Sequence, residues 1–347
     1  MNRLCVIIMI LVAHKAIELG ANGNQADAWT WLYAKKFAAS EAQKKKSSLV
    51  FVKTDVPCFS QLIFSWNAFR PQKGHYSFAV QVRDAATKEW SSWHKMIEWG
   101  EQVQRSYTTK SDGWAQYFHV RLETGTQRLA DSFCIKMEPH DGADLSLVRG
   151  CAVNVSDFTK FKSEVGSTTL GRLPSVVISD VPKKSQMVLD HPRSHELCSP
   201  TSTSMMAGYL CAAPIDPVDF AHKVFDSGLN AYGCWPFNTA HAFERCNGKV
   251  YFASVRFNSF AALHNQLSRN IPVVVSVRGV LDGAPKAYPK GHLLLVIGWD
   301  AVKKEVICHD PAFQADNGIL ARYPIDAFLS AWERSRRLAY SAESSRL

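Results

Sequence analysis

Cys198 is the residue of this sequence best placed for chemistry, because it directly precedes a segment predicted to be helical. It lies in HELCSPTSTSMMAGYL, residues 195–210. Pro200 suits the first turn of a helix, where a backbone N–H would be unpaired anyway. Cys198 is therefore expected at a helix N-terminus, where the dipole and free N–H groups stabilise a thiolate. This position predicts a nucleophile, and a small buried apolar residue is the alternative.

A candidate base for this thiol is His292, at the start of the apolar run GHLLLVIGWD. The next run, KEVICHDPA, contains Asp310 and follows a short turn, which predicts an antiparallel hairpin. A turn centred on Ala301 pairs the two residues directly, and one centred on Val302 makes them diagonal neighbours. Either register places both side chains on one face. A register between these two would place them on opposite faces.

Together these three residues could perform acyl transfer. Asp310 would bind imidazole Nδ1 of His292, which leaves Nε2 to accept the proton of the thiol. The reaction also needs an oxyanion site, for which the backbone N–H of Cys198 and the side chain of Gln186 are candidates. A structural histidine, a turn residue at position 310 and an ordinary loop glutamine are the alternative interpretations.

Three other histidines are weaker candidates for the base. His191 and His195 lie in a proline-containing loop whose geometry the sequence does not determine. His309 precedes Asp310, and neighbouring residues of a strand point to opposite faces. No C-x-x-C pair occurs, which argues against structural zinc and thioredoxin-type redox chemistry. The proposed chemistry needs no metal and no cofactor.

The elements that must position these residues differ between the two halves of the chain. In the second half, helical patterns cover residues 200–209, 218–226 and 261–269. Short apolar runs at residues 272–277 and 293–299 are typical of buried strands. Helices followed by a compact sheet predict an α+β domain.

The first half alternates apolar and polar residues over residues 48–160, which predicts an antiparallel β-sandwich. The clearest case is YSFAVQV, in which four alternate side chains are apolar: Tyr76, Phe78, Val80 and Val82. Five tryptophans concentrate in this half, namely Trp66, Trp90, Trp93, Trp99 and Trp114. Core or rim packing is the favoured interpretation of these rings, and a sugar-stacking platform is the alternative.

The N-terminus predicts export. A ten-residue apolar run, Leu4 to Ala13, follows Arg3; it is too short to span a bilayer but fits a secretory signal. Cleavage after Gly23 or Ala28 would be suitable, and a buried N-terminal strand is the alternative. We expect a signal peptide and a protein that is secreted or periplasmic.

Composition narrows the class of protein further. The chain has 347 residues, enough for about two domains, and a net charge of +9 spread along its length. The densest basic run, Lys44 to Lys46, is interpreted as part of a solvated linker, with an anionic-surface contact as the alternative. No zinc finger, homeodomain or aromatic RNA-binding signature occurs, which argues against nucleic acid as a partner. No later segment is long enough for stable membrane insertion.

Cysteine usage leaves disulfide pairing open. Nine cysteines are present, and seven remain if Cys5 is removed with the signal and Cys198 stays free. An odd number cannot pair completely, and spacing does not determine which residues are joined.

Five blocks of the second half resemble the peptidase C-thirty-nine-like group, papain-like cysteine peptidases related to the bacteriocin-processing double-glycine peptidases. The blocks occur in the order of the family over roughly residues 178–340, as LCSPTSTSMM, GCWPFNTAHA, RFNSFAALHNQLSRNIPVVVSV, GHLLLVIGW and ICHDPAF. The alternating domain also looks like the N-terminal part of exported bacterial members. The resemblance implies a Cys-His-Asp centre with an oxyanion donor, carried onto Cys198, His292, Asp310 and Gln186.

Two positions depart from the family pattern, and one matching block needs an interpretation. His309 stands where the family commonly has asparagine before Asp-Pro, and Gln186 lies farther before Cys198 than papain-like enzymes usually show. The residues from Trp235 to Asn238 match a family block and are interpreted as a structural loop beside the cleft.

The predicted organisation has five parts: a signal peptide (1–23), a linker (24–47), a β-sandwich domain (48–160), a second linker (161–177) and a papain-like catalytic domain (178–347). The predicted function is that of a secreted cysteine peptidase acting on a peptide or protein. The β-sandwich would position the enzyme, with a glycan or a protein as its candidate ligand. A catalytically silent binding module is one alternative, and amine acyl transfer or amidohydrolysis by the same triad is another.

Overall fold

The structure is a computed structural model that describes residues 28–40, 47–110, 113–125 and 127–344. The predicted signal peptide and the basic run from Lys44 to Lys46 lie outside these residues. Among the residues that are described, no helix combines the length and the apolar character needed to cross a membrane.

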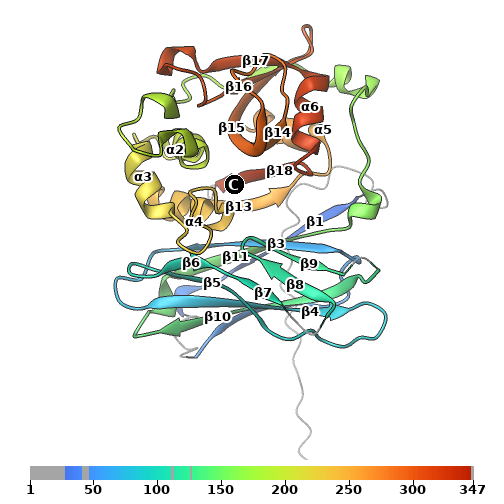
Figure 1. The fold of residues 1–347 in the computed structure, drawn as a ribbon, viewed down its shortest axis with the longest axis vertical. Coiled ribbons are helices and arrows are strands. Elements are labelled where there is room, and N and C mark those ends of the chain that lie inside the picture. Colours follow the sequence, from blue (N-terminus) through green and yellow to red (C-terminus); the bar gives the residue numbers. More distant parts are fainter. Residues whose placement is uncertain (1–27, 41–46, 111–112, 126, 345–347) are drawn as a thin grey trace, which may run out of the picture.

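The N-terminal half consists of antiparallel strands (Figure 1). Their bounds are β1 Thr30–Lys36, β2 Leu49–Lys53, β3 Gln61–Ala68, β4 His75–Asp84, β5 His94–Gly100, β6 Gln104–Ser106, β7 Thr108–Lys110, β8 Ala115–Phe118, β9 Arg121–Thr124, β10 Ala130–His140 and β11 Val148–Ser156. One sheet has the order β1-β11-β3-β9-β8-β7, and the other has the order β2-β10-β4-β5-β6.

The two sheets pack through an aromatic core. The four alternate residues of YSFAVQV are all fully buried, as the alternation predicts: Tyr76, Phe78, Val80 and Val82. Trp66 of β3 stacks on Phe78 of β4, with 4.2 Å between ring centroids, and contacts Trp99 of β5 edge-on. Trp66 and Trp99 are therefore core residues, whereas Trp90 and Trp93 are 37% and 44% exposed.

The prediction of a linker over residues 24–47 is wrong for Thr30–Lys36. This segment is β1, an edge strand that pairs with β11 from Thr30 with Ser156 to Lys36 with Gly150. Most of its side chains are half-buried rather than alternately buried and exposed. Apolar surface lies on both of its faces, so the period of two that marks half-buried strands is absent from its sequence.

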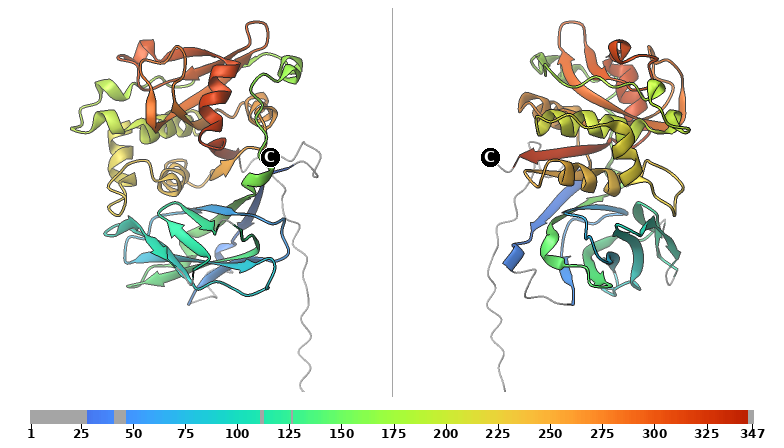
Figure 2. Two further views of the ribbon diagram at one scale, coloured as in Figure 1. Left: turned by 45° about the vertical axis from the view of Figure 1, so that its right-hand side comes forward. Right: turned by 90° about the vertical axis from the view of Figure 1, so that its left-hand side faces the viewer.

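The second half is an α+β domain, as predicted. Its strands are β12 Val176–Val177, β13 Val250–Arg256, β14 Val273–Gly279, β15 Tyr288–Asp300, β16 Glu305–His309, β17 Leu320–Pro324 and β18 Leu338–Ser344. Its helices are α2 Cys198–Leu210, α3 Pro217–Val224, α4 Trp235–Arg245, α5 Phe260–Ser268 and α6 Ile325–Glu333. The sheet has the order β13-β18-β14-β15-β16-β17, with β12 beside β15. Helix α2 lies on one side of β14 and β15, and α5 and α6 lie on the other (Figures 1 and 2).

Two expectations for this half need correction. The block starting at Trp235 was expected to be a loop, but it begins α4. Pro236 occupies the first turn of that helix, and Phe237 and Phe243 are fully buried on it. The strand β12 also lies inside the predicted second linker, so the sheet of the second half begins slightly earlier than expected.

The two halves are joined along β13, an edge strand of the second half's sheet. Side chains of the first sheet bind its backbone. Asn67 of β3 donates to the Phe252 carbonyl at 3.0 Å and accepts from the Phe252 N–H at 2.8 Å. Asn154 of β11 accepts from the N–H of Arg256 at 2.9 Å. The N-terminal domain thus covers an edge whose polar groups would otherwise be open to pairing with another chain.

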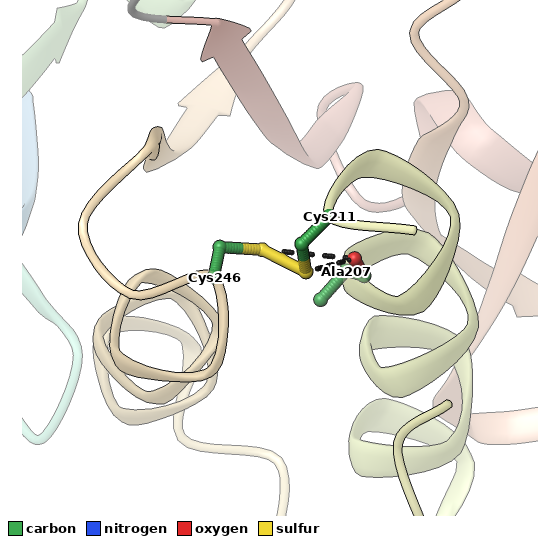
Figure 3. Close-up of a disulfide and its surroundings, with 3 residues drawn as sticks. All are labelled: Ala207, Cys211 and Cys246. Atoms are coloured by element: carbon green, nitrogen blue, oxygen red, sulfur yellow. Dashed lines mark hydrogen bonds between the residues drawn. A yellow bond between two sulfur atoms is a disulfide. The ribbon is translucent and has the colours of Figure 1, made fainter. Parts of the chain in front are cut away.

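A disulfide connects two helices of the second half (Figure 3). Cys211, just after α2, is bonded to Cys246, just after α4, with 5.2 Å between their Cα atoms. The remaining cysteines of the described residues are free: Cys58, Cys134, Cys151, Cys198, Cys234 and Cys308. The bond ties the helix that begins at Cys198 to the helix that packs against β3 of the N-terminal domain.

Candidate active site

Cys198 is the first residue of α2, where the helix expected from Pro200 begins. One turn later, the Ser202 hydroxyl donates to the Leu293 carbonyl at 3.0 Å, which holds α2 against β15. Burial by itself would raise the pKa of the Cys198 thiol. A hydrogen bond with His292, the charge of that ring and backbone hydrogen bonds from Leu293 and Ser199 outweigh this effect and lower the pKa.

His292 is buried on β15 and contacts both other residues of the predicted triad. Burial alone would lower the pKa of its imidazole, but the charge and hydrogen bond of Asp310 and the contact with Cys198 raise it. The pKa of Cys198 is lowered and that of His292 is raised, so each charged group stabilises the other. This arrangement favours a thiolate and imidazolium pair.

The His292 ring is turned the opposite way from the prediction. Its Nε2, not its Nδ1, lies 2.7 Å from Oδ1 of Asp310. Across the two strands, Asp310 is a diagonal rather than a direct neighbour of His292. Nε2, the ring nitrogen farther from the backbone, is therefore the one that reaches it. Nδ1 is then left for the thiol of Cys198. The two nitrogens exchange their predicted roles, while the sequence of proton transfers stays the same.

A β-bulge brings the base and its carboxylate together. Near the turn, Asp300 pairs with Glu305, a register that would place the pair on opposite faces if it continued unchanged. The register shifts by one residue at Ile297. Beyond this bulge the strands follow the register predicted for a turn centred on Val302, and both side chains share a face.

Asp310 is fully buried and accepts four hydrogen bonds. Its donors are His292 Nε2 at 2.7 Å, the Ala312 N–H at 2.9 Å, the Tyr288 hydroxyl at 2.9 Å and the Tyr323 hydroxyl at 2.7 Å. Burial would raise the pKa of this carboxyl, but the charge of His292 and these hydrogen bonds lower it. Asp310 is therefore held as a carboxylate. The two tyrosines were not identified in the sequence.

Tyr288 also stacks on His292, with 4.1 Å between ring centroids and 16° between planes. Residues four apart on a straight strand are about 13 Å apart. The register between β14 and β15 shifts between these two residues, and Gly291 there has a φ of +94°. Glycine adopts this conformation without strain. The spacing of Tyr288 and His292 indicated a shared face, but only the folded strand produces the contact.

Gln186 lies between two segments of the site, on the short 3₁₀ turn η5 (Gln186–Val188). Its backbone N–H donates to the Pro311 carbonyl at 2.9 Å, directly after Asp310. Its Nε2 donates to the Ser194 carbonyl at 3.1 Å, on the turn η6 (Ser194–Glu196) that precedes Cys198. No hydrogen bond joins it to Cys198 within the described residues, so its oxyanion role stays a prediction.

The other histidines lie away from the thiol. The Nδ1 of His309 lies 3.1 Å from the Pro182 carbonyl, and its side chain is turned away from Asp310 as expected of a strand neighbour. His191 contacts Tyr232, and His195 is exposed beside Glu196. Over the described part of the chain, no group of three or more side chains is arranged to bind a metal ion.

An acidic thiol next to an imidazole that a buried carboxylate orients is the chemistry of a cysteine peptidase. The sequence agrees: residues 178–340 match the Peptidase_C39 like family. The match confirms the predicted resemblance of this part of the chain to that family.

Two further comparisons concern a solved structure and the curated proteins. Xylellain, a cysteine protease from Xylella fastidiosa, is similar in structure with a TM-score of 0.35 and 11% sequence identity. The similarity covers 55% of this chain and 94% of xylellain. No curated protein matches the sequence significantly.

Proposed function

We propose that Cys198, His292 and Asp310 are the catalytic triad of a peptidase that hydrolyses peptide or amide bonds. One observation carries this assignment. His292 contacts the thiol of Cys198 and, through Nε2, the buried carboxylate of Asp310 at 2.7 Å. The family match supports the reaction class, and the geometry supports the role of each residue.

In this mechanism the Cys198 thiolate attacks the carbonyl carbon of the substrate. The backbone N–H of Cys198 and the side-chain amide of Gln186 donate to the oxyanion. His292 gives its Nδ1 proton to the leaving amine as the C–N bond breaks, which leaves an acyl-enzyme. His292 then takes a proton from water, hydroxide attacks the thioester, and the carboxylic acid leaves as the thiolate re-forms.

Thiol labelling tests the nucleophile against a matched cysteine. Cys134 is also half-buried and free, but burial raises the pKa of its thiol. At pH 6.5 we expect iodoacetamide to modify Cys198 at least tenfold faster than Cys134, because the thiolate is the reacting form. Mass spectrometry of the folded protein measures both rates. Equal rates, or an unreactive Cys198, would contradict the assignment.

The acyl acceptor is tested by product analysis. Incubation with a peptide library and a primary amine should give new carboxyl ends, which Cys198→Ala no longer produces. Products that carry the amine instead would indicate acyl transfer. Labelling of Cys198 without either product would favour the catalytically silent binding module.

We also propose that the two packed sheets are the predicted β-sandwich and that the protein is exported. The disulfide between Cys211 and Cys246 supports export, because disulfides persist mainly in oxidising compartments. Protein recovered from the periplasm or the medium should lack the first 23 to 28 residues. N-terminal sequencing measures this, and exported material that still begins at Met1 would refute the signal peptide.

A further inference from the structure

The N-terminal domain reaches the catalytic domain through a buried carboxylate that the mechanism does not use. Asp226 lies in the loop after α3 and is fully buried. Ser106 of β6 donates its N–H to Oδ1 at 2.9 Å and its hydroxyl to Oδ2 at 2.5 Å. The N–H groups of Gly228 and Leu229 donate to Oδ1 at 2.9 and 3.2 Å. The Asp226 side chain thus binds β6 of the N-terminal domain and also holds the conformation of the loop in which it lies.

A second residue of β6 strengthens this contact. The Gln104 amide donates to the Phe225 carbonyl at 2.8 Å, and its backbone carbonyl accepts from the Ser227 N–H at 3.1 Å. The approach is so close that a Cβ at Gly228 would lie 2.0 Å from the backbone oxygen of Ser106. Only glycine is compatible with this contact, so the loop and β6 are matched to each other.

The other side of the same loop packs against the segment that precedes the nucleophile. Arg193 donates to the Asn230 side chain at 3.1 Å and to its carbonyl at 2.8 Å. Its guanidinium lies over the ring of Tyr232, 5.0 Å from the centroid. The Tyr232 hydroxyl is also 3.3 Å from Nε2 of His191. These contacts hold the chain a few residues before Cys198.

The packing around this loop extends to Leu197, the residue directly before Cys198. Leu197 is the N-cap of α2 and is fully buried. It belongs to a small apolar cluster with Ala221 and Tyr232, against which Leu189 and Phe225 pack. The residue before Cys198 therefore packs against Phe225 and Tyr232, which flank the loop that Asp226 shapes. This cluster is separate from the main core of the protein.

We propose that Asp226 is a positioning residue through which β6 of the N-terminal domain holds residues 189–197, and with them the thiol of Cys198. The same segment contains Ser194, whose carbonyl binds the amide of Gln186. The proposal rests on the proposed function and goes beyond it, because it gives the N-terminal domain a part in the reaction.

Three variants and one control test this role. Asp226→Ala removes the four hydrogen bonds described above and the contact with the Cys234 thiol. Asp226→Asn keeps the Oδ1 acceptor, and Ser106→Ala removes the hydroxyl while keeping the N–H. Asp55→Asn is the matched control, because Asp55 is exposed in the N-terminal half and pairs with Arg83 rather than with β6. Amide hydrogen exchange, kcat and KM for a peptide substrate, and the rate of Cys198 alkylation are measured for each folded protein.

We expect Asp226→Ala to lower kcat by roughly tenfold to a hundredfold, because small displacements of reacting groups have effects of this size. KM should stay within twofold. Exchange should become at least about tenfold faster over residues 189–197, while β14 and β15 keep their protection. Asp226→Asn should recover most of the kcat, Ser106→Ala should fall between the two, and Asp55→Asn should match wild type.

Two results would overturn the proposal. In the first, Asp226→Ala and Ser106→Ala keep wild-type kcat and wild-type exchange over residues 189–197. In the second, exchange rises uniformly over the catalytic domain, which shows a general structural role.

If the wild type neither cleaves peptides nor reacts at Cys198, the proposed triad fails, and hydrogen exchange still decides the role of Asp226. If Asp226→Ala does not fold, Ser106→Ala provides the same comparison.

Discussion

His292→Ala is expected to lower kcat/KM by at least about a thousandfold, since removal of the base of a nucleophile–base pair has effects of this size or larger. The variant removes the proton acceptor for the thiol and the donor for the leaving amine. It also removes the hydrogen bond and the charge that lower the pKa of the Cys198 thiol most, which leaves only the backbone hydrogen bonds of Leu293 and Ser199 to oppose burial.

The pH dependence of Cys198 alkylation gives this prediction a second readout. In the wild type, the rate should rise with pH through a value below the ordinary thiol pKa of about 8.5. In His292→Ala the rise should move above that value, because burial disfavours the thiolate. His140→Ala is the control, since that histidine is exposed in the N-terminal domain. An unchanged pH profile in His292→Ala would contradict the role of His292 as the partner of the thiol.

Asp310→Ala is expected to lower kcat by roughly a hundredfold to ten-thousandfold, as loss of the group that orients a catalytic imidazole does. It also leaves the buried donors of Tyr288 and Tyr323 without their acceptor. We therefore expect a loss of roughly 3–5 kcal/mol in the free energy of unfolding. Kinetics on the folded variant and urea denaturation measure the two effects separately.

Asp310→Asn separates orientation from charge. An asparagine keeps an oxygen that can accept from Nε2 of His292, and the hydroxyls of Tyr288 and Tyr323 can rotate to accept from its amide. We expect a loss of only about tenfold in kcat and a smaller loss of stability. If Asp310→Ala retains the kcat and the pH profile of the wild type, Asp310 does not act on His292 as proposed.

Much of the fold follows from local patterns. The alternation in YSFAVQV predicts a half-buried strand, and the structure has β4 there with all four apolar side chains buried. The proline two residues after Cys198 predicts a helix start, and α2 begins at Cys198. These features depend on residues close in sequence, so the sequence is sufficient to predict them.

Other elements were missed because their environment comes from distant parts of the chain. Strand β1 lies at the edge between two domains and is half-buried on both faces, so its sequence has no period of two. Helix α4 was interpreted as a loop, although Pro236 and the apolar pair Phe237 and Ala240, three residues apart, were signals for a helix. Tyr288 and Tyr323 reach Asp310 from separate strands, and no local pattern connects them.

The sequence by itself determined the chemical types of the site and their order along the chain. A cysteine at a helix start, a histidine at the mouth of a buried strand and an aspartate at the end of the next strand are local features, and the family match over residues 178–340 agrees with them.

Only the tertiary structure decided how these residues meet, because strand β15 is irregular at two points. An extra residue at Ile297 changes the register and moves Asp310 to the face of His292. The register shift next to Gly291 places Tyr288 on the imidazole, whose Nε2 faces the carboxylate. From His292 to Trp299 the strand is buried on both faces. An apolar run of this kind has no alternation that could specify its register, so packing against the neighbouring strands determines it.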